Sequence, residues 1–114
     1  MALQGTNREI GEIVIVDLSG KITLGEGSSM LRHTIRELLD RGHRKIVLNL
    51  YDVDYIDSSG IGELVSGYTT VRGANGELKL LYLTKRVHDL LQITRLFTVF
   101  DVRADEEDAI RSFS

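Results

Sequence analysis

The spacing of hydrophobic positions changes several times along the chain and predicts alternating strands and helices. The segment 13–19 is a β-branched run bounded by Gly11 and Gly20, which is typical of a strand. A weaker stretch from about residue 3 to residue 10 precedes it. We expect the two segments to pair as a hairpin through Gly11.

The next segment has the spacing of an amphipathic helix. From about residue 26 to residue 41, apolar residues recur every three or four positions. These apolar residues are Leu31, Ile35, Leu38 and Leu39. Ser28 or Ser29 is expected to cap the start of this helix, and Gly42 is expected to end it in a left-handed conformation.

A near-continuous apolar run over 45–51 follows, and it is typical of a central strand that is covered on both faces. A second helix is expected to begin near Ser58 and to end at the turn Asn75-Gly76. Its apolar stripe comprises Ile61, Leu64, Val65, Tyr68 and Val71. This strand and helix form the middle of the predicted fold.

The remaining residues continue the alternation. They predict a strand over 78–83, a helix capped by Thr84, a short strand over 99–102 and an acidic helix from about Asp105. Repeated strand-helix-strand units connect parallel strands. The sequence therefore predicts an α/β fold: a mostly parallel, mixed sheet of about five strands flanked by about four helices, with the first strand antiparallel at an edge.

Composition narrows the class of protein. The 114 residues fit one domain, so we expect 1–114 to be a single domain. The absence of cysteine excludes disulfides, cysteine-based metal sites and thiol nucleophiles. A net charge of −3 disfavours nucleic-acid binding by phosphate neutralisation. The apolar runs are too short to span a bilayer and no signal peptide is visible, so we expect a cytoplasmic protein.

Polar residues are concentrated between the central strand and the second helix. Three acids and two adjacent serines lie there: Asp52, Asp54, Asp57, Ser58 and Ser59. The carboxyl ends of strands are where α/β sheets place their sites. With Ser58 as N-cap, its hydroxyl would lie beside the unpaired N–H groups of the helix. The alternative is that these residues serve only as helix caps.

Two glycines in the first turn of this helix, Gly60 and Gly62, also have two interpretations. They leave the first turn free of side chains, so a partner can approach the backbone closely. Alternatively, they serve the packing of the helix on the sheet.

Two segments carry the strongest part of a family resemblance: Ile46-Val-Leu-Asn-Leu and Tyr55-Ile-Asp-Ser-Ser-Gly-Ile-Gly. Supporting matches are Leu18-Ser-Gly-Lys-Ile, Asn75-Gly-Glu-Leu-Lys-Leu and the stretch from Val87 to Leu96-Phe97. Over roughly residues 10–103 the chain resembles a STAS domain, and specifically the single-domain anti-sigma factor antagonists of bacteria.

The resemblance implies a binding protein and not an enzyme. It implies that Ser58 is phosphorylated by a serine kinase that is also the anti-sigma factor. The unphosphorylated form would bind this kinase and free the sigma factor, and a PP2C-type phosphatase would restore that form. The partner surface is expected at Asp57, Ser58, Ser59, Gly60, Ile61, Gly62 and Glu63. We expect no metal, cofactor, direct nucleic-acid contact or membrane insertion, and a monomer or weak dimer.

Two other functions stay open, one suggested by the residues and one by the family resemblance. Asp52, Asp54 and Asp57 suggest a phosphoaspartate receiver, but such a site needs further acids for Mg²⁺, and the earlier strand offers only Asp17 in its interior. The other function is a STAS scaffold or adaptor in a stress-signalling or lipid-transport complex, which uses the same surface without phosphorylation. The segment 23–28 carries no motif, so it leaves the partner's identity open.

Overall fold

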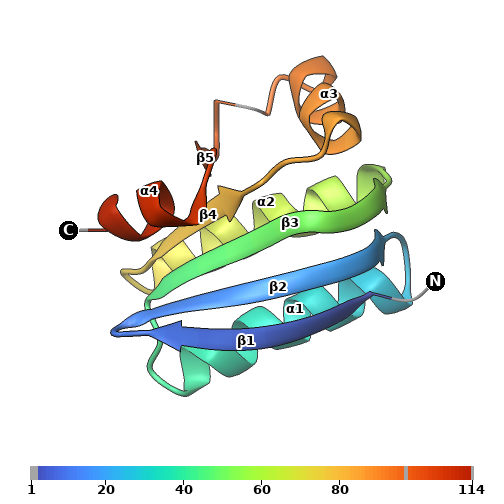
Figure 1. Cartoon of the computed structure of the whole chain (residues 1–114). Helices are drawn as coiled ribbons and strands as arrows, with labels where there is room; N and C mark the ends of the chain where they lie inside the picture. The colour runs from blue at the N-terminus through green and yellow to red at the C-terminus, as the bar shows by residue number, and fades with distance from the viewer. Residues whose placement is uncertain (1–2, 97, 114) are drawn as a thin grey trace.

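The computed structural model describes residues 3–96 and 98–113, which form a five-stranded mixed sheet with helices on both faces (Figure 1). The elements are β1 (Gln4–Ile10), β2 (Ile13–Ile22), α1 (Glu26–Asp40), β3 (Lys45–Ile56), α2 (Ser58–Gly73), β4 (Glu77–Leu81), α3 (Lys85–Ile93), β5 (Asp101–Arg103) and α4 (Glu106–Arg111). The strands lie in the order β1-β2-β3-β4-β5. Only the β1–β2 pair is antiparallel, so the predicted α/β fold and edge strand are confirmed.

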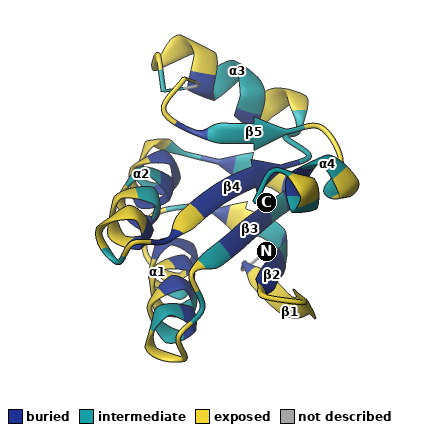
Figure 2. Ribbon diagram, turned by 90° about the vertical axis from the view of Figure 1, so that its left-hand side faces the viewer, coloured by how far each residue is buried: buried dark blue, intermediate teal, exposed yellow. Residues whose placement is uncertain are grey.

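The larger part of the core lies between the sheet and the helices α1 and α2 (Figure 2). In β3, Ile46, Val47 and Leu48 are completely buried, as the continuous apolar run predicted. A smaller cluster on the opposite face packs Ala109 of α4 against the sheet. Coverage on both faces makes β3 a fixed support for the helix that follows it.

Strand β3 is longer than the apolar run predicted. Beyond Tyr51 it pairs only with β2, because its pairing with β4 ends at Asn49. Buried Val53 and Ile56 are separated there by the exposed Asp54 and the half-buried Tyr55, so this part of the strand is less completely covered than 46–48. The last strand is also displaced: β5 covers Asp101–Arg103, not 99–102.

Helix ends were predicted in part. Gly42, with φ 92°, ends α1 as expected, and Thr84 caps α3 by accepting a hydrogen bond from the N–H of Val87. The start of α1 differs from the prediction, because the N-cap is Gly25 and no side chain caps the helix. Ser28 instead lies within the first turn, where its hydroxyl donates to the carbonyl of Thr23 at 2.9 Å. Residue 97, part of one supporting match, lies outside the described residues.

The first turn of α2 packs tightly against the ends of β2 and β3. A Cβ added at Gly60 would overlap the carbonyl oxygen of Ile22 and would lie 2.6 Å from the side chain of Ile56. The N–H of Asp57 also donates to the Ile22 carbonyl, at 3.3 Å. Gly60 is therefore required for packing, and the start of α2 has a fixed position on the sheet. Gly62, in contrast, faces open space.

We expect Gly60→Ala to destabilise the fold and Gly62→Ala to leave it intact. At Gly60 the added methyl group meets backbone, so overpacking should lower the free energy of unfolding by about 1–3 kcal/mol. At Gly62 the change should be neutral or stabilising by up to about 1 kcal/mol, because alanine favours a helix. Urea unfolding of both variants checks this, and equal stabilities would contradict the described packing.

Candidate functional site

The candidate site lies at the carboxyl ends of β2 and β3, where α2 begins. Asp57 is the N-cap of α2: one carboxylate oxygen accepts from the N–H of Gly60 at 2.8 Å and the other from the N–H of Leu24 at 3.2 Å. Ser58 is therefore the first residue of the helix and not its cap, because the aspartate before it occupies the cap position. The Asp57 carboxylate joins the β3–α2 junction to the β2–α1 loop.

These hydrogen bonds favour the ionised form of Asp57. The bond from the Gly60 N–H has the largest effect, with smaller contributions from the N–H groups of Leu24 and Ser59, and together they hold the pKa of the Asp57 carboxyl below its ordinary value. The site therefore keeps a negative charge directly beside Ser58 at neutral pH.

The side chain of Ser58 is accessible. The residue is exposed, and among the described residues no hydrogen bond to its hydroxyl is formed. It stands at the amino end of α2, where the helix has its positive end. A hydroxyl in this position can be reached by another molecule without first breaking a contact within the domain.

The other predicted surface residues differ in accessibility. Gly62 is exposed and Ser59 is half-buried, whereas Gly60 and Ile61 are buried. Glu63 is also buried, and Arg32 of α1 donates two hydrogen bonds to its carboxylate at 3.1 and 3.0 Å. Gly60, Ile61 and Glu63 thus expose little surface for the predicted direct contact with a partner, because these groups pack α2 against the sheet and α1.

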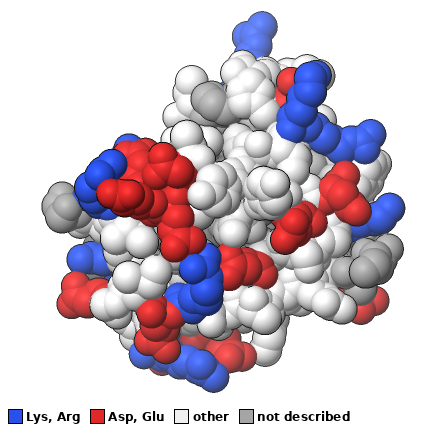
Figure 3. All heavy atoms as spheres, viewed as in Figure 1, with Lys and Arg blue, Asp and Glu red and all other residues white. Residues whose placement is uncertain are grey.

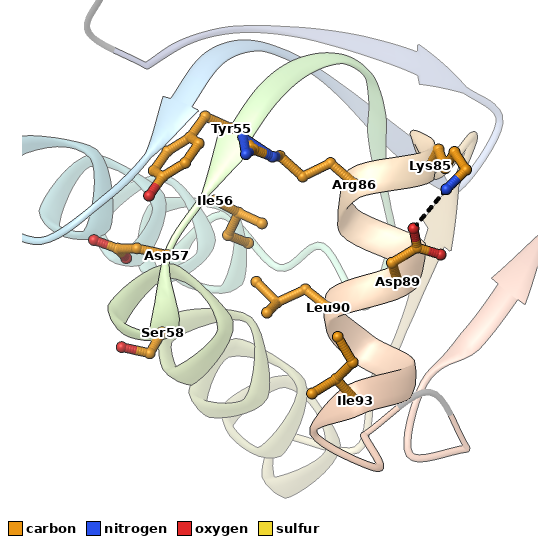
Figure 4. A pocket seen from close by; sticks show the side chains of 9 residues that line it. All are labelled: Tyr55, Ile56, Asp57, Ser58, Lys85, Arg86, Asp89, Leu90 and Ile93. Atoms are coloured by element: carbon orange, nitrogen blue, oxygen red, sulfur yellow. Dashed lines mark hydrogen bonds and ion pairs between the residues drawn. The ribbon is translucent and has the colours of Figure 1, made fainter.

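A groove of about 740 Å³ lies between Ser58 and α3 (Figure 4). We call it the α3 groove; it is lined by Tyr55, Ile56, Asp57, Ser58, Lys85, Arg86, Asp89, Leu90 and Ile93. The guanidinium of Arg86 lies over the ring of Tyr55, 4.7 Å from its centroid, and Lys85 is paired with Asp89 at 2.9 Å. Figure 3 shows Lys and Arg side chains gathered around α3.

Two aliphatic side chains near this site are strongly exposed. Leu24, in the loop whose N–H bonds to Asp57, and Ile93, at the end of α3, each keep 78% of their surface accessible. Sequence reasoning missed both. The only signal for Leu24 was an apolar residue in a glycine-rich loop, and Ile93 was not distinguishable from the helix's buried residues. These side chains are candidates for contact with another protein.

The STAS domain model matches residues 6–109. The chain belongs to the STAS domain family. The anti-sigma F factor antagonist of Paenibacillus polymyxa is 30% identical and covers 86% of this chain and 84% of its own length. The anti-sigma-B factor antagonist of Bacillus subtilis is 31% identical and covers 84% of this chain and 86% of its own length.

A solved structure confirms the fold of this STAS domain. The crystal structure of a Thermotoga maritima protein assigned as an anti-sigma factor antagonist superposes with a TM-score of 0.87. That match covers 95% of this chain and 92% of the other, and at 22% identity it concerns the fold alone.

The acids of the STAS domain do not gather into a receiver-type site. Asp17 is bound by Arg8 and Asn49 on its own face of the sheet. It lies opposite Asn49 in the register, so Asp57 is eight residues further along, roughly 26 Å at ~3.3 Å per residue. Within residues 3–96 and 98–113, no group of three or more His, Asp or Glu residues is placed to hold a metal ion.

None of the helices in the described segments is both long enough and apolar enough to cross a membrane.

We expect Asp57→Asn to destabilise the STAS domain at pH 7 and much less at pH 3. The N–H groups of Gly60 and Leu24 bond to different oxygens of Asp57, and asparagine keeps only one of these oxygens. One of the two hydrogen bonds is therefore lost, and the melting temperature should fall at pH 7. Because the pKa of Asp57 is lowered on folding, the stability from its ionised form is present above the unfolded value of about 3.9 and is lost as pH falls through the folded value. The two proteins should therefore converge in acid.

Thermal unfolding at both pH values measures this, with Asp54→Asn as control. Asp54 is exposed, and its substitution removes the same charge without touching the two N–H groups. A constant difference between Asp57→Asn and wild type from pH 7 to pH 3 would show that the carboxylate does not act through its charge.

Proposed function

We propose that this STAS domain is an anti-sigma factor antagonist that is switched by phosphorylation of Ser58. The observation that carries the proposal is the Ser58 hydroxyl, which is exposed and forms no hydrogen bond to another described residue. It lies at the first position of α2, directly after the charged N-cap Asp57. Curated relatives that match over more than four fifths of both chains are named anti-sigma factor antagonists. Residues 1–114 act as one binding domain in the cytoplasm, where sigma factors work.

The proposed cycle has three proteins. Unphosphorylated Ser58 lies in the interface with an anti-sigma factor that is also a serine kinase, and this complex frees the sigma factor. The kinase phosphorylates Ser58 and the complex dissociates. A PP2C-type phosphatase removes the phosphate. The domain itself binds and is modified, and does not catalyse.

Charge explains how the modification acts on the complex. A phosphate adds about −1.5 to −2 charges at Ser58, directly beside the ionised Asp57. Within the domain, the amino end of α2 favours this charge. In a packed interface the same charge loses its hydration and lies against the negative charge of Asp57. The complex is therefore destabilised while the fold is retained.

The contact surface follows from accessibility. At the start of α2, four residues have surface that a partner can contact: Asp57, Ser58, Ser59 and Gly62. The exposed side chain of Leu24, on the β2–α1 loop, extends this surface. The buried residues Gly60, Ile61 and Glu63 serve indirectly, by fixing the orientation of α2.

The test begins with the purified anti-sigma factor kinases of the host, incubated one at a time with this protein and ATP. Intact-mass and site-mapping analysis should find one phosphate on Ser58 and none on Ser58→Ala. Ser59→Ala is the matched control and should still be phosphorylated. Phosphate on Ser59, or on Ser58→Ala, would contradict the assignment.

Binding of the same kinase to two charge variants completes the test. Ser58→Asp should weaken affinity about a hundredfold, or ~2.8 kcal/mol, with an unchanged melting temperature. Ser66→Asp adds the same charge at an exposed position further along α2 and should bind like wild type. If Ser58→Asp unfolds, the residue is structural. If the kinase binds but never phosphorylates, the domain is a constitutive scaffold.

A further inference from the structure

Ile93 has no role in holding α3 on the domain. The helix is attached by Val87 and Leu91, both completely buried, and by the half-buried Leu90. Ile93, in the last turn, keeps 78% of its surface accessible and lines the α3 groove (Figure 4). Together with Leu90, the exposed Ile93 forms an apolar wall of the groove that a partner's apolar side chain can cover.

Arg86, on the same helix, carries a charge that is not paired with any charged side chain of the described residues. Its guanidinium lies 4.7 Å from the centroid of the Tyr55 ring, and no ion pair between described residues includes it. The adjacent Lys85 forms an ion pair with Asp89, so the Asp89 carboxylate already has a cationic partner. The α3 groove therefore has an apolar wall at one end and an unpaired guanidinium at the other.

We propose that the α3 groove is a second docking region for the anti-sigma factor, and that it takes a segment presenting a carboxylate next to an apolar side chain. The carboxylate pairs with Arg86, and the apolar side chain packs on Leu90 and Ile93. The segment is acidic where it meets Arg86, because this guanidinium forms no ion pair with a described residue. The Asp57 carboxylate also lines the groove, but it accepts from the N–H groups of Gly60 and Leu24 and points away from α3 (Figure 4). The inference rests on the proposed function, since it assigns the same partner.

The position of Ser58 on the rim of this groove connects docking to the switch. Ser58 and Asp57 line the groove on the side opposite α3, with their side-chain oxygens directed away from that helix (Figure 4). A phosphate on Ser58 adds negative charge at the rim of the groove and so repels an acidic segment lying in it. One modification then acts on both parts of the interface.

The experiment measures affinity and association rate for the purified host kinase that phosphorylates Ser58, at low and high salt. Arg86→Gln should weaken binding about tenfold at low salt and reduce the dependence of the association rate on salt, while Arg86→Lys should keep most of that dependence. Ile93→Ser should weaken binding about tenfold by faster dissociation, with little effect of salt.

Matched controls lie at the opposite end of the strands. Lys45→Gln removes the same charge at the start of β3, and Ile10→Ser changes an exposed isoleucine, 37% accessible, at the end of β1. Both should bind the kinase within twofold of wild type. Melting temperatures of all variants show whether α3 remains folded.

The outcomes separate the two proposals. If Ser58→Asp weakens binding but the Arg86 and Ile93 variants bind like wild type, the groove is not part of the interface and the switch stands. If the groove variants weaken binding and Ser58→Asp does not, the groove stands and the switch fails. If no host kinase binds, both fail. Self-association that Ile93→Ser abolishes without changing kinase affinity would assign the groove to a second copy of the chain.

Discussion

The two hydrogen bonds accepted by Asp57 hold together the end of the domain where its chemistry lies. One fixes the first turn of α2, through the N–H of Gly60, and the other fixes the β2–α1 loop, through the N–H of Leu24. The close contact between Gly60 and the end of β2 allows no other position for that turn. The exposure of Ser58 and of Leu24 follows from this arrangement.

Much of the fold could be predicted because it depends on residues that are close together in the sequence. The run at Ile46–Leu48 has no polar interruption, as full coverage of β3 requires, and the cap at Thr84 and the left-handed Gly42 depend on neighbouring residues alone. The start of α1 was not predictable in this way. A Cβ at Gly27 would lie 2.7 Å from the Lys21 carbonyl, so the helix start depends on its contact with β2 and not on a capping serine.

The site was predictable only where it is continuous in sequence. The stretch from Asp57 to Gly62 marked the junction and its exposed serine. The burial of Glu63 was not visible, because its partner Arg32 comes from another helix. The α3 groove is lined by Tyr55 and Arg86, which are 31 residues apart in the sequence. Only the docking of α3 on the sheet brings them together.

The Ser58 hydroxyl forms no hydrogen bond to another described residue, and this affects how the proposed phosphorylation switch can evolve. Exchanging its hydrogen for a phosphate breaks no hydrogen bond among the described residues, so the proposed phosphorylation and its reversal do not require any such bond to be broken. By thermodynamic linkage, the ratio of the partner's affinities for the two forms reflects the difference between the phosphate's interactions in the complex and in the free domain. Substitutions on the partner can tune that ratio while the stability of this domain stays constant.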